Sequence, residues 1–151
     1  MDEVAHVNAV HFEGHFLIGE GAFLGRTRLS QVALPNTLTG IGAGAFSGCT
    51  RLSSVRIPHN ATGIGVGAFY GSSSLTSVTI PNSVTNIVYY AFSGCTNLRG
   101  AYFLGNAPLF SSDCFSSADQ ATVYYLPGTS GWGKTFGDRA DRALAARSSG
   151  E

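Results

Sequence analysis

A repeat with a period of about 23 residues organises the chain and constrains its fold more than any other feature. Three successive units share an Ile-Gly start, an Ala-Phe pair, a leucine and a proline at strict spacing, over residues 18–40, 41–63 and 64–86. Residues 87–109 are a looser copy, and residues 110–137 form a degenerate closing unit that keeps its phenylalanine and a Tyr-Leu-Pro-Gly run. Self-similarity at such a period is typical of a solenoid, in which each unit buries its apolar face against its neighbours.

One half of each unit reads Leu-x-x-Val-x-Ile-Pro, with variations, and alternates apolar and polar residues. This alternation predicts a short strand with one buried face, which ends at the proline because proline has no N–H for the ladder. A half repeat over residues 7–17 precedes the first full unit and carries the same alternation. Neighbouring strands should run parallel, about 4.8 Å apart. We therefore predict six strands, near Val7, Leu29, Leu52, Leu75, Leu98 and Ala121.

The other half of each unit reads Ile-Gly-x-Gly-Ala-Phe-x-Gly. Because glycine permits tight bends, this half predicts a short helical or 3₁₀ turn on the convex side. The recurring positions also predict columns of core residues. One column contains Ile18, Ile41, Ile64, Ile87 and Phe110, and an aromatic column contains Phe23, Phe46, Phe69, Phe92 and Phe115. The inner core is completed by Leu29, Leu52, Leu75, Leu98, Val32, Val55, Val78, Leu34, Ile57 and Ile80.

The segments AFSGCTNL and LTSVTIPNSVTNI resemble the BspA-like class of leucine-rich repeat, named for bacterial surface antigens, and the resemblance covers residues 7–137. The ending ATVYYLPGTSGWGKTFG resembles the closing unit of some members. The asparagine of common leucine-rich repeats is kept at Asn60 and Asn106 but not at Thr37 or Ser83, which fits this subclass. We expect an α/β solenoid, a right-handed leucine-rich-repeat superhelix with a parallel concave β-sheet and short helical turns outside. The resemblance implies a secreted or cell-surface protein involved in adhesion or protein binding.

Composition excludes several classes of partner. Nine basic and nine acidic residues cancel, so no net field favours nucleic acid or an anionic membrane. No apolar run approaches the roughly 18–20 residues of a membrane span. The acidic start Met1-Asp2-Glu3 is followed by no apolar segment, so the chain as given shows no signal peptide. The first part of residues 138–151 favours a helix, and we interpret the whole segment as a C-terminal tail or a remnant of cloning.

The three cysteines are expected to be free and mostly buried. Cys49 and Cys95 hold the same position two units apart, roughly 9–10 Å from each other, whereas a disulfide needs Cα atoms within about 7 Å. Cys114 holds a different position. We expect all three to pack as small apolar groups.

No motif predicts a cofactor, a metal site or catalysis. Glycines such as Gly42, Gly44 and Gly48 resemble a nucleotide-binding loop, but such a fingerprint occurs once in a chain and these glycines recur in every unit. His11, Glu13 and His15 have the spacing of a metal site on a strand, yet the repeat places Glu13 at the end of that strand. Neither a Gly-x-Ser-x-Gly elbow nor a pair of carboxylates in a cleft is predicted, so we expect a protein that is not an enzyme.

The outward face of the strands is the surface that the repeat singles out. Strand alternation places one side chain of each unit on this face, and the candidate partner-binding residues are Arg56, Thr79, Tyr102 and Tyr125. Tyrosine and arginine are common anchors of interfaces. The leading hypothesis is recognition of a protein or glycan by the concave sheet.

Two alternatives remain open. The chain could be a structural spacer or stalk segment of a larger surface protein, or an isolated or engineered repeat fragment without a partner.

The predicted strand over residues 7–12 would be an open parallel edge of the sheet. Another copy of the chain could pair with this edge, or further repeats could precede it.

Overall fold

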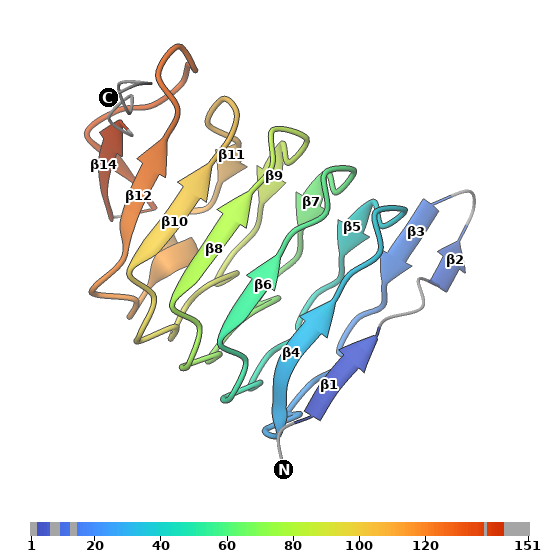
Figure 1. Cartoon of the computed structure of the whole chain (residues 1–151). Coiled ribbons are helices and arrows are strands. Elements are labelled where there is room, and N and C mark those ends of the chain that lie inside the picture. Colours follow the sequence, from blue (N-terminus) through green and yellow to red (C-terminus); the bar gives the residue numbers. More distant parts are fainter. Residues whose placement is uncertain (1–2, 7–9, 13–14, 138, 144–151) are drawn as a thin grey trace, which may run out of the picture.

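The computed structural model describes residues 3–6, 10–12, 15–137 and 139–143. The chain coils so that two columns of short strands run along its length (Figure 1). We call the first column the long-strand sheet; it contains β1 (Glu3–His6), β4 (Leu29–Ala33), β6 (Ser54–Arg56), β8 (Ser77–Ile80), β10 (Gly100–Phe103), β12 (Thr122–Tyr125) and β14 (Arg139–Ala143). The second, the short-strand sheet, contains β2 (Val10–Phe12), β3 (His15–Ile18), β5 (Gly40–Ile41), β7 (Gly63–Ile64), β9 (Asn86–Ile87) and β11 (Leu109–Phe110).

The predicted parallel strands are confirmed for the repeats, with partners one unit apart. Val55 pairs with Val78 and Val78 with Ala101, so each step along the ladder is one full period of the repeat. The short-strand sheet was not predicted. It forms at the isoleucine of each unit, where Ile41 pairs with Ile64 and Ile64 with Ile87.

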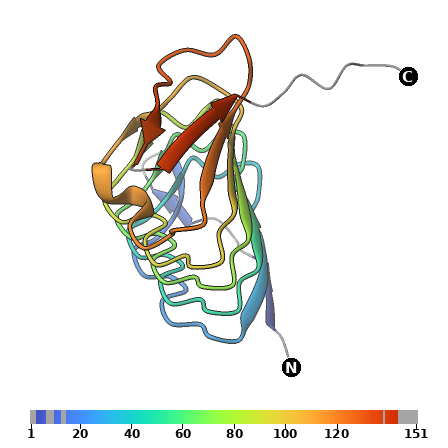
Figure 2. The same cartoon turned by 90° about the vertical axis from the view of Figure 1, so that its left-hand side faces the viewer.

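The third side of the coil, opposite the long-strand sheet, consists of hydrogen-bonded turns (Figure 2). The expected helical turn in each unit is not confirmed: within the described residues the one helix is the 3₁₀ helix η1 (Ser112–Phe115), in the closing unit. Two residues of each of the first four turns adopt left-handed backbone angles. Both are glycines in the first three turns, as at Gly67 (φ +57°) and Gly71 (φ +68°), and they are Tyr90 and Gly94 in the fourth. Between Gly67 and Gly71, the Phe69 N–H donates to the Ala91 carbonyl of the next unit at 2.8 Å. The turns therefore stack through their own backbone ladder without becoming helices.

Ser117 occupies the position that left-handed glycines hold in the earlier units, and its own φ is +57°. A residue with a Cβ in this conformation costs about 1–2 kcal/mol. We therefore expect Ser117→Gly to raise the free energy of unfolding by about 1 kcal/mol, measured by guanidinium denaturation, since the added flexibility of the unfolded chain offsets part of the relief. The neighbouring Ser116 has φ −55°, so Ser116→Gly should instead lower it by about 0.5–1 kcal/mol. Equal effects of the two changes would contradict this account.

The aromatic column runs through the middle of the coil. The rings of Phe23, Phe46, Phe69, Phe92 and Phe115 stack in sequence, with centroids 5.1, 5.3, 5.3 and 5.4 Å apart. Four of them are buried, while Phe23 at the first turn is half-buried. The four isoleucines of the predicted isoleucine column are buried too. The prediction is wrong for its last residue, Phe110, which is 42% exposed.

The last strands close the coil with a different arrangement. Residues 139–143, expected to favour helix, form β14, which pairs parallel with β12. β13 (Thr135–Phe136) pairs antiparallel with β14 and places Phe136 in the core, where its ring lies 5.1 Å from that of Phe103. These residues extend the long-strand sheet by two strands, β14 and then β13, beyond β12.

The beginning of the chain also differs from the prediction. The strand that pairs with β4 is β1, with His6 opposite Ala33, whereas the repeat pattern placed His11 there. Residues 10–12 form β2, which pairs antiparallel with β3 in the short-strand sheet, so that His11 lies opposite Phe16. The predicted open edge over residues 7–12 is therefore wrong for residues 10–12, and residues 7–9 lie outside the described part of the chain.

Candidate functional site

The candidate site is the exposed face of the long-strand sheet. The ladders align Arg56 on β6 with Thr79 on β8, Thr79 with Tyr102 on β10, and Tyr102 with Tyr124 on β12. We call these four residues the outer row. Arg56 and Thr79 are exposed, and the two tyrosines are half-buried. Neighbouring strands thus bring three predicted residues together on one surface.

The fourth predicted residue, Tyr125, is not part of this row. It lies opposite Phe103 on the inner side of the sheet and stacks on Trp132 with ring centroids 4.8 Å apart. The closing unit is shorter than the others by a single position at this point, because Tyr102 pairs with Tyr124 where a full period would place Tyr125. Since such a slip moves every side chain of a strand to the opposite face, Tyr124 takes the exposed position.

The two tyrosines of the outer row form a stacked pair. Their ring centroids are 5.0 Å apart and their planes differ by 11°. The Tyr102 ring leans along its strand over Gly100, where an added Cβ would come within 2.6 Å of the ring. Gly100 therefore provides the space that fixes the orientation of Tyr102, although serine holds the equivalent position at Ser54 and Ser77.

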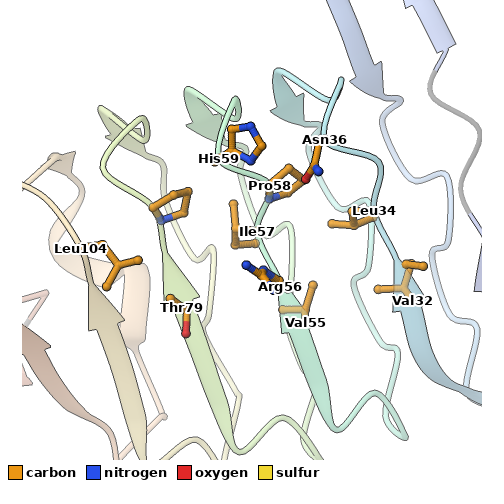
Figure 3. A pocket seen from close by; sticks show the side chains of 12 residues that line it. Val32, Leu34, Asn36, Val55, Arg56, Ile57, Pro58, His59, Thr79 and Leu104 are labelled. Carbon is orange, nitrogen blue, oxygen red and sulfur yellow. The ribbon is translucent and has the colours of Figure 1, made fainter.

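A groove of about 580 Å³ lies beside the outer row, where the strands end (Figure 3). It extends from β4 to the residue after β10, and we call it the strand-end groove. Arg56 and Thr79 of the outer row contribute to its lining. The complete lining is Val32, Ala33, Leu34, Asn36, Val55, Arg56, Ile57, Pro58, His59, Thr79, Pro81 and Leu104. Sequence reasoning missed this groove, because its walls combine strand and loop residues of different units.

The family model for the BspA type leucine-rich repeat region matches residues 17–132 in six copies. The chain belongs to this family. The expected resemblance is therefore confirmed, and the repeats described above are BspA-type leucine-rich repeats. Proteins of this type are associated with bacterial cell surfaces, and the fold is typically non-catalytic.

Solved structures of other leucine-rich repeat proteins are similar to this chain. A leucine-rich repeat protein of T. pallidum superimposes with a TM-score of 0.58 and 20% identity, over 84% of this chain and 75% of that one. A leucine-rich repeat protein from Bacteroides ovatus has a TM-score of 0.49 and 20% identity, with 81% and 47% coverage. A leucine-rich cell surface protein from Faecalibacterium prausnitzii has a TM-score of 0.48 and 18% identity, with 85% and 55% coverage. At such identities the first likeness shows the shared fold. No curated protein sequence matches the chain.

Other candidate chemistry was tested against the described part of this BspA-type chain. There, no group of three or more His, Cys, Asp or Glu residues could hold a metal ion. His11 and His15 lie on the paired strands β2 and β3, and Glu13 lies outside the described residues. Among the described helices none has the length and apolarity needed to cross a membrane.

The turn side of the BspA-type coil carries a second group of exposed apolar residues. Tyr89 and Tyr90 are 54% and 46% exposed, and Tyr70 is 51% exposed. Tyr89 and Tyr90 form a pair with ring centroids 6.5 Å apart. Tyr70 adds a third aromatic residue, so the turn side serves as the internal comparison for the outer row.

The cysteines of the repeat are buried, free and hydrogen-bonded to the backbone. The Cys49 and Cys95 thiols donate to the Phe23 and Phe69 carbonyls, both at 3.2 Å. Ser72, at the same position of the intervening unit, donates to the Phe46 carbonyl at 3.0 Å. Burial raises the pKa of the Cys49 thiol to about 11 and that of Cys95 to about 12, above the usual 9.0.

These thiols should be unreactive in the folded protein. We expect a thiol reagent to modify Cys49, Cys95 and Cys114 slowly at pH 8 in native protein and all three at once in denaturant. Because the folded pKa values of Cys49 and Cys95 are raised, the stability that they contribute is present below pH 9 and lost as the pH rises from 9 towards 11–12. A variant with Cys49→Ser and Cys95→Ser should lose less stability over that range, since serine already occupies this position in one unit. Recovery of fewer than three thiols from freshly purified, denatured protein would contradict the prediction.

Proposed function

We propose that this protein is a non-catalytic binding module that recognises a protein or a glycan through the outer row and its surroundings. The observation that carries the proposal is the alignment of Arg56, Thr79, Tyr102 and Tyr124 on one exposed face. Side chains on a rigid ladder lose little conformational freedom when a partner binds. The family association with bacterial cell surfaces supports a secreted or cell-surface location and a role in adhesion.

The charged and aromatic residues of the row are of the types that dominate binding energy. Arginine and tyrosine are enriched among the interface residues whose truncation weakens binding most. The Tyr102 ring lies over Gly100 and stacks on the Tyr124 ring, so the two rings are already ordered before a partner arrives. The smaller Thr79 side chain between Arg56 and Tyr102 leaves room for a partner group between them.

The test compares the exposed sheet face with the turn side. A variant with Arg56→Ala, Tyr102→Ala and Tyr124→Ala should lose capture of glycans or purified extracellular proteins on arrays, by about tenfold or more in affinity. Its circular dichroism spectrum and melting temperature should stay close to those of the unchanged protein, because none of the three side chains belongs to the core.

The matched control is Tyr89→Ala with Tyr90→Gly, which removes the aromatic pair of the turn side. Glycine is chosen for Tyr90 because that residue has φ +61° and the preceding units have glycine there. This control should bind normally. Loss of binding by the control alone would move the site to the turn side, and unchanged binding by both variants would favour a structural spacer segment instead.

A further inference from the structure

The strand-end groove lies at an interruption of the long-strand sheet. β6, β8, β10 and β12 form a continuous ladder, but β4 pairs with β1 and forms no ladder with β6. The Ser53 N–H still donates to the Ser30 carbonyl at 3.3 Å, which holds the two strands together at one end. Towards the other end, Val32 and Leu34 are half-buried, whereas the equivalent Val55 and Ile57 of the next unit are buried. The groove therefore reaches apolar side chains that are covered elsewhere in the sheet.

The charge of the groove favours an anionic group. Arg56, on the exposed face of β6, contributes to the lining of the groove (Figure 3). Its guanidinium forms no hydrogen bond or ion pair within the described part of the chain. His59 is the second basic residue of the lining, and none of the twelve lining residues is acidic. A carboxylate fits the planar guanidinium fork and can accept two hydrogen bonds from it.

The rest of the lining favours an aliphatic group. Eight of the twelve lining residues are aliphatic or proline, but four of these, Val55, Ile57, Pro58 and Pro81, are buried; the most exposed large aliphatic side chain is Leu104 at the far end, at 42%. A sugar ring would offer mainly hydroxyl groups to the exposed Leu104 side chain, which cannot form hydrogen bonds with them. An aliphatic side chain would instead bury its surface there at a gain of about 25 cal/mol per Å².

The size of the groove limits the ligand to a short segment. Its volume of about 580 Å³ is in the range of small-ligand pockets and far below that of a folded domain. It extends from β4 to β10, three strand steps, which is about 14 Å. An extended peptide covers this distance with about four residues. Asn36 at the rim is held in place, because its carbonyl accepts a hydrogen bond of 2.7 Å from the Asn60 amide.

We propose that the strand-end groove binds a short extended peptide segment in which an aspartate or glutamate is next to an aliphatic residue. The acidic side chain pairs with Arg56, and the aliphatic side chain packs against the exposed Leu104 at the far end of the groove. This inference rests on the proposed function, since it names the class of partner that the same face recognises.

The test uses a phage-displayed library of random linear heptapeptides, selected on the immobilised 151-residue chain. The selected peptides should be enriched in Asp or Glu adjacent to Leu, Ile or Val. A synthetic peptide of the enriched sequence should bind about tenfold more weakly to Arg56→Ala. Arg99→Ala removes another exposed arginine outside the groove, and this variant should bind the peptide as the unchanged protein does.

Two further variants separate a binding role from a structural one. Selection on Arg56→Glu should replace the acidic residue of the enriched peptides with Lys or Arg, an outcome that a general loss of folding cannot produce. Selection on Leu104→Ser should keep the acidic residue and lose the aliphatic preference.

The outcomes also distinguish this inference from the proposed function. Enriched peptides without an acidic residue, or equal binding to Arg56→Ala and Arg99→Ala, would overturn the inference while leaving recognition by the outer row intact. Glycan capture that depends on Tyr102 and Tyr124, without selection of any peptide, would do the same. If no ligand of either class binds and the outer-row variant behaves like the unchanged protein, both proposals fail together.

Discussion

Phe69→Ala should lower the free energy of unfolding by about 3–5 kcal/mol. Phe69 is fully buried and its ring stacks on both sides, 5.3 Å from Phe46 and 5.3 Å from Phe92. Truncation removes the buried ring surface and leaves a cavity between two rigid turns, whose backbones are joined by hydrogen bonds and cannot close it. Guanidinium denaturation followed by circular dichroism measures the change.

Tyr70→Ala is the matched control, because Tyr70 is the next residue on the same turn and is 51% exposed. Its truncation should cost about 1 kcal/mol at most. Phe23→Ala should fall between the two, since Phe23 ends the stack and is half-buried. Similar losses for Phe69→Ala and Tyr70→Ala would contradict the position of the aromatic column.

Gly137→Ala should lower the free energy of unfolding by about 2–4 kcal/mol, from backbone strain and overpacking together. Gly137 has φ +55° and is buried, and an added Cβ would lie 2.6 Å from the Cys114 sulfur and 2.9 Å from the Phe115 ring. Neither neighbour can move freely, because both are buried side chains of the closing unit. Because β13 and β14 flank Gly137, amide exchange in Arg139–Ala143 should accelerate more than in β8.

Gly133→Ala provides the comparison for this change. An added Cβ at Gly133 meets no atom within 4 Å, and the residue has no left-handed φ. Its stability should change by about 0.5 kcal/mol or less. If Gly137→Ala is equally harmless, the closing segment does not pack on the last repeat as described.

The repeating part of the fold could be predicted from the sequence because each position recurs. A single Phe or Val is ambiguous, but five phenylalanines at one spacing define a column, and their rings do stack. The strands of the long-strand sheet could be predicted for the same reason. The strands of the short-strand sheet could not be predicted, because two-residue strands such as Gly63–Ile64 are too short to show an alternation of apolar and polar residues.

The errors lie where the repeat loses its redundancy. The closing unit is one residue shorter than the period before its strand. Because Tyr124 and Tyr125 are the same residue type, the sequence does not indicate which of them occupies the exposed position. At the beginning of the chain, two short apolar runs could each have formed the strand that pairs with β4. In the structure this strand is β1. In residues 139–143, pairing with β12 overrides helix propensity. Three of the four candidate site residues were thus placed correctly on the exposed face, and the groove beside them depends on an absent ladder that no local pattern encodes.

The constant length of the repeat has a consequence for how such a protein can change size in evolution. Loss or duplication of one whole unit, such as residues 41–63, would bring positions of the same kind together again. After loss of that unit, Phe23 would face Phe69, and the Ser72 hydroxyl would meet the Phe23 carbonyl in place of the Cys49 thiol. An insertion of one residue inside a strand would instead turn its core side chains outward. The length of the solenoid and the area of its exposed sheet face can therefore increase together, by one strand or about 4.8 Å for each added unit.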